Sequence, residues 1–147
     1  MFCVRSLPML TPASVSQYYY VQSDNNPASD PRTLWRNGGP GASSIAYGMM
    51  TEIGQLVFNR DSLEDNSTAV PVLQYNRFGW SRFTNMLYLE SPAGVGFSYC
   101  DPSALPCTSN DTSTAEDAYD ALVAFYNRFP TFAKRPFFIT GESYAGI

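Results

Sequence analysis

The chain has 147 residues, of which 44% are hydrophobic and 15% aromatic, and its formal net charge is −4. This length suffices for one domain with a hydrophobic core, and the composition excludes an intrinsically disordered chain. The acidic balance lacks the basic surface of a nucleic-acid-binding protein. No apolar run approaches the roughly 20 residues that span a bilayer, and the N-terminus lacks the apolar stretch of a signal peptide. With no histidine in the sequence, we expect neither a zinc site nor any other cofactor.

In the first half, the pattern predicts two strands and a helix. The residues before Gln17 are expected to be irregular, and the aromatic and β-branched run Gln17–Gln22 predicts a strand. After a turn-rich connection, Thr33–Trp35 is predicted to be a buried strand that ends in the glycine-rich segment Asn37–Gly41. Residues 43–54 have a helical composition, with Gly54 as the expected C-cap. Residues 59–71 are expected to form a polar loop.

In the second half, Phe83–Leu89 is predicted to be a strand, and Ser113–Phe129 gives the clearest helix. Ser113 and Glu116 have the spacing of a capping box, and Pro130 ends the helix. Phe137–Thr140 is predicted to be another buried strand. Alternating strands and helices indicate a parallel sheet of the α/β class. The apolar face expected for the helix comprises Ala115, Ala118, Tyr119, Leu122, Phe125, Tyr126 and Phe129.

The cysteines and two glycosylation sequons bear on the cellular compartment. Cys100 and Cys107 flank a proline-containing loop where a short disulfide is feasible, and two free thiols are the alternative. The sequons begin at Asn66 and Asn110, in polar segments. Such triplets often arise by chance, but these agree with residence in the secretory pathway.

Ser143 has the surroundings of a catalytic nucleophile. It follows an apolar strand and is flanked by small residues at Gly141 and Ala145. A serine on a tight strand-to-helix turn exposes its hydroxyl, and small neighbours relieve the crowding of that turn. A bare Gly-x-Ser is otherwise an ordinary turn. A serine hydroxyl is a weak nucleophile without an adjacent base. The motif therefore predicts a serine nucleophile, but these 147 residues contain no histidine that could act as its base.

The segment Asn37–Gly41 is the second candidate element. It is not a phosphate-binding loop, because no lysine followed by serine or threonine comes after the glycines. Glycines at a strand end instead suit an oxyanion loop, where backbone N–H groups point at a developing negative charge. In an α/β-hydrolase, one N–H comes from such an early loop and one from the residue after the nucleophile. Gly39 and Tyr144 are the two donors expected here.

Glu52 and Glu142 form the third candidate feature. Taken singly, each is expected to be a solvated carboxylate. Glu142 is adjacent to Ser143, however, and so would line the same pocket. Two carboxylates close together in a shielded site have raised pKa values, and a protonated one can donate a hydrogen bond. Such a pair would suit the capture of a substrate carboxylate at acidic pH.

Three long motifs together resemble the serine carboxypeptidase family. They are Asn37–Ser44, Asn85–Tyr99 and Thr140–Ile147, and Arg5–Pro8 is similar to the start of the family's mature domain. The resemblance covers nearly the whole chain in order. It implies one partial α/β-hydrolase domain over residues 1–147, with the family's catalytic aspartate and histidine expected beyond Ile147.

The resemblance implies that the function is removal of C-terminal residues from peptides and proteins, in a vacuole, a lysosome or outside the cell. By motif position, Ser143 corresponds to the nucleophile, and Gly39 and Tyr144 to the oxyanion donors. The residues that correspond to those recognising the substrate's terminal carboxylate are Asn37, Gly38, Glu52 and Glu142.

The chain also departs from the family pattern. Ala42 stands where a cysteine is usual, and Arg36 replaces an apolar residue at a strand end expected to be buried. The stretch between Leu10 and Tyr18 is short, so the first strands are expected to be eroded. Two other functions remain open: an acyltransferase of the same fold, or a non-catalytic remnant that binds. The strand Phe137–Thr140 is expected to lack a cover and to form an apolar sheet edge.

Overall fold

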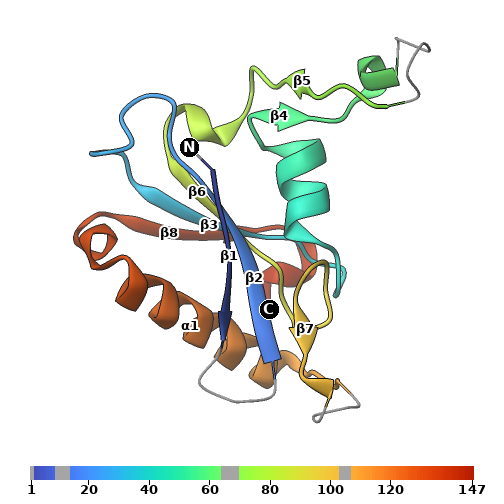
Figure 1. The fold of residues 1–147 in the computed structure, drawn as a ribbon, viewed down its shortest axis with the longest axis vertical. Coiled ribbons are helices and arrows are strands. Elements are labelled where there is room, and N and C mark those ends of the chain that lie inside the picture. Colours follow the sequence, from blue (N-terminus) through green and yellow to red (C-terminus); the bar gives the residue numbers. More distant parts are fainter. Residues whose placement is uncertain (1, 9–13, 64–69, 103–106) are drawn as a thin grey trace.

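A mixed β-sheet with helices on both faces forms the centre of the molecule, in a computed structural model that describes residues 2–8, 14–63, 70–102 and 107–147 (Figure 1). The sheet order is β1-β2-β6-β3-β8, and β7 pairs with the end of β2. The sheet strands are β1 (Phe2–Pro8), β2 (Ser14–Val21), β3 (Arg32–Arg36), β6 (Asn85–Leu89), β7 (Tyr99–Cys100) and β8 (Phe137–Gly141).

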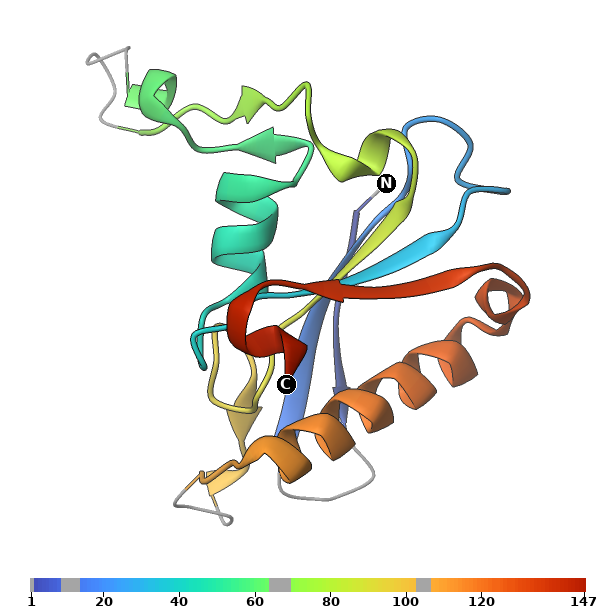
Figure 2. The ribbon, with the colours of Figure 1, turned by 180° about the vertical axis from the view of Figure 1, so that it is seen from behind.

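Two long helical segments cover the sheet. Helix α1 (Asp111–Arg128) lies on one face, and the shorter helix η1 (Ser44–Glu52), a π-helix, lies on the other (Figures 1 and 2). A small hairpin of β4 (Leu56–Val57) and β5 (Gln74–Tyr75) extends beyond η1. The remaining short turns are η2 (Arg60–Leu63), η3 (Trp80–Arg82), η5 (Pro130–Lys134) and η6 (Ser143–Gly146).

The central strands alternate their side chains between two cores. On β6, Leu87 and Leu89 join the cluster under α1, whereas Met86 and Tyr88 join the cluster under η1. Strands buried on both faces have continuous apolar sequences, because successive side chains point to opposite sides. This confirms the predicted α/β class. The sheet is not purely parallel as predicted, because β2 pairs antiparallel with both β1 and β6. The three predicted inner strands are confirmed as β2, β3 and β6, with bounds that differ by one to three residues.

The N-terminal prediction was wrong. Residues 2–8 are not irregular but form β1, which pairs antiparallel with β2 over seven positions, from Phe2 opposite Val21 to Pro8 opposite Val15. The first strands are therefore not eroded. A strand at a sheet edge takes its hydrogen bonds from its neighbour, so its own side-chain pattern predicts it weakly.

Both predicted helices are confirmed, but their ends differ. Helix η1 ends at the C-cap Ile53 and not at Gly54. Helix α1 begins two residues earlier than predicted, with Asn110 as its N-cap. The capping box joins Asn110 and Ser113, whose backbone N–H donates to the Asn110 side chain at 2.9 Å, and does not involve Glu116. Asparagine is as good an N-cap as serine.

The predicted apolar face of α1 is partly right. Ala118 and Phe125 are buried in the core, and Leu122, Tyr126 and Phe129 pack against it. Tyr119, however, is 67% exposed. Ala115 is exposed as well. The predicted polar loop at 59–71 contains the turn η2 with a buried Ser62, and its residues 64–69, with the Asn66 sequon, lie outside the described residues.

The strand predicted at Phe137–Thr140 is confirmed as β8, but it is not buried. It pairs with β3 alone and occupies the edge of the described sheet. Phe138 is 53% exposed and Ile139 is 71% exposed, which agrees with the predicted apolar sheet edge. Phe137 is the exception, because its ring packs against Tyr126 of α1.

Candidate active site

Ser143 lies at the carboxyl end of β8 in a strained turn. Its φ is +51°, a left-handed conformation that residues other than glycine rarely adopt. The turn closes through a hydrogen bond from the Ala145 N–H to the Glu142 carbonyl at 3.0 Å. A Cβ at Gly141 would lie 2.7 Å from the Arg36 carbonyl oxygen and 2.8 Å from the Ala145 Cβ. The turn therefore requires the small residues that predicted it, and Ser143 itself is exposed to solvent.

The glycine-rich loop lies directly against this turn, which Figure 2 shows at the end of β8. A Cβ at Gly38 would come within 2.6 Å of the Tyr144 backbone nitrogen and 3.1 Å of the Ser143 Cβ. Gly39 has a φ of +109°, and the Ala42 N–H donates to the Gly38 carbonyl at 3.0 Å. The loop can approach the serine turn this closely only because position 38 lacks a side chain. The two segments predicted to act together are thus adjacent.

Asn37 joins the two glutamates beside the serine turn. Its Nδ2 donates to Oε1 of Glu142 at 2.9 Å and to Oε2 of Glu52 at 3.1 Å. Glu52 is the last residue of η1, and Glu142 lies between β8 and η6. One amide therefore holds together two carboxylates that are 90 residues apart in the chain.

The expectation of a shielded carboxylate pair was wrong. Glu52 and Glu142 are both exposed to solvent, although the Asn37 that bridges them is buried. The pair lies at the rim of the fold because η1 ends and β8 terminates at the surface. The two carboxylates are therefore open to a ligand.

Neighbouring residues that the sequence analysis did not identify determine the orientation of Asn37. The Trp35 indole Nε1 donates to Asn37 Oδ1 at 2.8 Å, so the amide nitrogen must face the glutamates. The Ser44 hydroxyl accepts from the Asn37 backbone N–H at 3.0 Å. Gly48 leaves room for this arrangement, since a Cβ there would lie 2.6 Å from Asn37 Oδ1. The sequence could have indicated the contact between Trp35 and Asn37, because residues two apart on an extended strand point to the same face.

Glu90 supports the other end of the glycine-rich loop. It is completely buried, and its Oε1 accepts from the Ser43 hydroxyl at 2.6 Å and the Ile45 N–H at 3.3 Å. Burial raises the pKa of this carboxyl, and the hydrogen bonds from Ser43, Ile45 and Ser44 oppose that rise. Because Ser43 is the N-cap of η1, Glu90 holds the junction between the loop and the helix. Glu90 lies in one of the quoted motifs, but its role was not predicted.

Arg36 is partly buried, as expected for its place at the end of β3. One of its guanidinium nitrogens donates to the Ser91 hydroxyl at 3.2 Å. Burial lowers its pKa. The positive charge of Arg36, which was expected at a buried strand end, is thus hydrogen-bonded to the neutral hydroxyl of Ser91.

The serine turn is also linked to the first turn of α1. The Tyr144 hydroxyl donates to Oδ1 of Asp111 at 2.8 Å. This hydrogen bond and the negative charge of Asp111 raise the pKa of the Tyr144 phenol. The link joins η6, which carries the expected oxyanion donor Tyr144, to the helix on the same face of the sheet.

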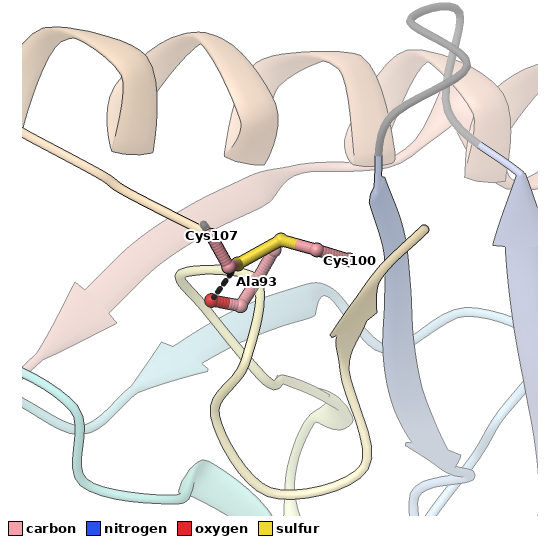
Figure 3. The surroundings of a disulfide bond; sticks show 3 residues. All are labelled: Ala93, Cys100 and Cys107. Atoms are coloured by element: carbon pink, nitrogen blue, oxygen red, sulfur yellow. Dashed lines mark hydrogen bonds between the residues drawn. A yellow bond between two sulfur atoms is a disulfide. The ribbon is translucent and has the colours of Figure 1, made fainter. Parts of the chain in front are cut away.

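Cys100 and Cys107 form a disulfide, with Cα atoms 5.9 Å apart (Figure 3). The bridge decides between the two alternatives left open by the sequence. The Cys107 sulfur lies 3.5 Å from the Ala93 carbonyl oxygen, in the loop that follows β6 (Figure 3). The disulfide therefore attaches the segment preceding α1 to that loop.

Over residues 2–8, 14–63, 70–102 and 107–147 no three His, Cys, Asp or Glu side chains cluster as a metal site would require. None of the helices in these segments has both the length and the apolar character needed to cross a membrane.

The fold and the geometry of the site define the class of protein. A nucleophile-type serine in a left-handed turn after a parallel strand, next to a glycine loop from a neighbouring strand, is the arrangement of an α/β-hydrolase. The family model of the serine carboxypeptidases matches residues 13–147. The chain belongs to the serine carboxypeptidase family.

Individual relatives agree with this assignment. The chain is 47% identical over 131 residues to serine carboxypeptidase-like 26 of Arabidopsis thaliana, and 45% identical over 130 residues to the lysosomal protective protein of Mus musculus. Each match covers 88% of this chain but only 27% and 25% of the relative, respectively. The chain thus spans about a quarter of the length of these relatives.

A solved structure shows the same fold. Kex1(Δ)p, a prohormone-processing carboxypeptidase from Saccharomyces cerevisiae, superposes with a TM-score of 0.78 at 22% sequence identity. The match covers 99% of this chain and 31% of that protein. The yeast enzyme therefore shares the fold of this chain.

Proposed function

We propose that this chain supplies the nucleophile, the oxyanion donors and the terminal-carboxylate clamp of a serine-type carboxypeptidase. The observation that carries the proposal is the Asn37 amide, which joins Glu52 and Glu142 next to Ser143. An exopeptidase has to recognise the free end of its substrate. A protonated glutamate and an amide together can bind a carboxylate through several hydrogen bonds.

The mechanism follows from the geometry. The Ser143 hydroxyl attacks the carbonyl carbon of the last peptide bond and forms a tetrahedral intermediate. The backbone N–H groups of Gly39 and Tyr144 stabilise its negative oxygen. A general base has to take the serine proton and later protonate the leaving amine. These 147 residues contain no histidine, so a histidine base must come from outside them.

The localisation that we propose is a lysosome, a vacuole or the extracellular space, because the mouse relative is named for the lysosome.

The experiment compares free-acid and amidated peptides on the full-length protein that carries this chain. We expect release of the C-terminal residue only from the free acid, together with labelling of Ser143 by an organophosphonate that Ser143→Ala abolishes. Equal kcat/KM for free-acid and amidated peptides would refute the clamp. Transfer of an acyl group to an alcohol, with no peptide hydrolysis, would instead support the acyltransferase alternative.

A polypeptide of only these 147 residues serves as the control. Because it holds no histidine, we expect neither an ester burst nor stoichiometric labelling. Labelling of Ser143 in this polypeptide would mean that another group activates the serine.

A further inference from the structure

The glycine-rich loop ends against a carboxyl group that is enclosed from two sides. Glu90, which directly follows β6, is completely buried. Its Oε1 accepts from the Ser43 hydroxyl at 2.6 Å and from the Ile45 N–H at 3.3 Å, both at the start of η1. On the other side, a Cβ at Gly96 would lie 2.4 Å from the Glu90 Cδ and 2.5 Å from each carboxyl oxygen. The carboxyl group is therefore held between the start of η1 and the loop that follows β6.

The backbone of Glu90 is hydrogen-bonded to the neighbouring strand of the sheet. Its N–H donates to the Gln17 carbonyl at 3.0 Å, and its carbonyl accepts from the Ser98 hydroxyl at 2.8 Å. The same Ser98 hydroxyl accepts from the Gln17 N–H at 2.8 Å. Because Gln17 belongs to β2, which pairs with β6, the position of Glu90 is fixed by the sheet.

The middle of the glycine-rich loop has no comparable attachment. Gly39 and Gly41 have φ of +109° and +97°, and neither has a side chain that could pack against a neighbour. The position of the Gly39 N–H, the proposed oxyanion donor, is therefore set from the two ends of the loop. One end is Gly38, which lies against the serine turn, and the other is Ser43, which donates to Glu90.

We propose that Glu90 is a positioning residue, which keeps the Gly39 N–H in place for the reaction by fixing Ser43. The inference rests on the proposed function of the site. Because Glu90 is completely buried, it acts through the loop and not on the substrate. An oxyanion donor stabilises charge that develops in the transition state, so displacement of the loop should lower kcat and leave substrate binding unchanged. This role differs from that of Glu52 and Glu142, which are proposed to bind the substrate.

The test compares Glu90→Ala with Glu90→Gln in the full-length protein that carries this chain. The substrates are p-nitrophenyl acetate, which has no carboxylate for the clamp, and the free-acid dipeptide N-benzoyl-Leu-Leu. In Glu90→Ala we expect kcat for both to fall by about a hundredfold, as for a misplacement of about 1 Å. Glu90→Gln keeps the acceptor oxygen and the volume, so it should retain kcat. The Kd of the dipeptide, measured with Ser143→Ala added to each variant, should not change.

Asn85 provides the control for a general loss of stability. It is also completely buried and lies at the other end of β6, where its side-chain amide donates to the carbonyls of Asp30 and Pro31 at 3.1 Å. Asn85→Ala should therefore lower the free energy of unfolding, as Glu90→Ala does, but leave kcat per folded molecule unchanged. Equal losses of kcat in the two variants would mean that Glu90 acts through stability alone.

Two glycines give a second test that leaves Glu90 in place. Gly96 and Gly94 both have a positive φ, of +55° and +93°, so a side chain strains either position. A Cβ at Gly96 would press on the Glu90 carboxyl group, whereas a Cβ at Gly94 would meet the Cys107 sulfur at an ordinary 3.7 Å. Gly96→Ala should therefore lower kcat more than Gly94→Ala does. Ser43→Ala should add no further loss to Glu90→Ala, because the two side chains form one link.

Failure of this inference and failure of the proposed function give different results. The inference is overturned, and the peptidase function stands, if the dipeptide is hydrolysed but a folded Glu90→Ala keeps its kcat or loses binding as much as kcat. Equal losses in the two glycine variants would overturn it as well. If Glu90→Ala slows ester hydrolysis but the protein with Glu90 releases no leucine from the dipeptide, the positioning role stands and the peptidase function is wrong.

Discussion

Single residues in this site are constrained mainly by how closely backbone segments approach one another. Gly38 is the clearest case, because a Cβ there would lie 2.6 Å from the Tyr144 nitrogen and 2.8 Å from the Glu142 carbonyl oxygen. Both neighbours are backbone atoms, which cannot rotate away as a side chain would. The separation of the loop from the serine turn is therefore set by this one residue.

Gly38→Ala should displace the loop and misplace the Gly39 N–H. Loss of one oxyanion donor reduces kcat by about a hundredfold to a thousandfold. We expect a loss of this size in the rate of peptide hydrolysis by the full-length protein. A rate equal to that of the original protein would contradict the proposed role of the loop.

The buried carboxyl of Glu90 makes the free energy of unfolding depend on pH. Its folded-state pKa lies above the ordinary value of 4.5, mainly because of burial. The folded state therefore holds a proton that the unfolded chain loses at lower pH, so the free energy of unfolding falls as the pH rises above 4.5 toward the folded pKa. Below both pKa values this cost is absent.

Glu90→Gln keeps an oxygen to accept from Ser43 and Ile45 but cannot ionise. We expect the variant to be more stable than the original protein at neutral pH, with the difference shrinking as the pH is lowered toward 4.5. Denaturant unfolding across this range measures the effect. A difference that grows on acidification would show that the sign is wrong.

Among the secondary-structure elements, the contact between η6 and α1 links the serine turn to the body of the fold. The Tyr144 hydroxyl and Asp111 form that contact at 2.8 Å. The beginning of α1 is itself held by the Asn110–Ser113 capping box, which completes a path of hydrogen bonds from the helix to the turn.

Removing this link should be visible in the titration of one phenol. The pKa of Tyr144 lies above its ordinary value of 10.0, first because of the hydrogen bond to Asp111 and second because of that residue's charge. In Asp111→Asn we expect the pKa to move back toward 10.0. NMR of tyrosines labelled at the ring carbons, with Tyr144→Phe to assign the signal, measures it. An unchanged titration would mean that the contact does not persist in solution.

At the scale of the whole molecule, β8 leaves the sheet with an apolar border. It pairs with β3 alone, and Phe138 and Ile139 are exposed although successive side chains of a strand point to opposite faces. An unpaired apolar strand is a template for association with other chains.

We expect a polypeptide of only these 147 residues to bind a hydrophobic dye and to melt without a sharp transition. Ile139→Lys should reduce dye binding and association, because a charge on an edge strand disfavours pairing. Tyr119→Lys, an exposed aromatic on α1, controls for the added charge. A monomer with one cooperative melt and dispersed amide signals would contradict this expectation.

The sequence by itself determined the elements whose backbone demands specific residues. The turn at Ser143 could be predicted because a left-handed strand-to-helix turn needs small neighbours. The close approach of the loop at Asn37–Gly41 could be predicted because glycine permits such an approach and a positive φ. The α/β class followed from strands apolar on both faces. These features depend on residues close together in the chain, so a short segment of sequence is enough to predict each of them.

Only the tertiary structure decided the features that depend on distant partners. Strand β1 exists because β2 supplies its hydrogen bonds, and the buried Glu90 accepts a hydrogen bond from Ser43, which is 47 residues away. The direction of the Asn37 amide is set by Trp35 on one side and by Glu142, 105 residues away, on the other. Local residue pattern cannot encode such contacts, because their free energy arises only when the folded chain brings the partners together.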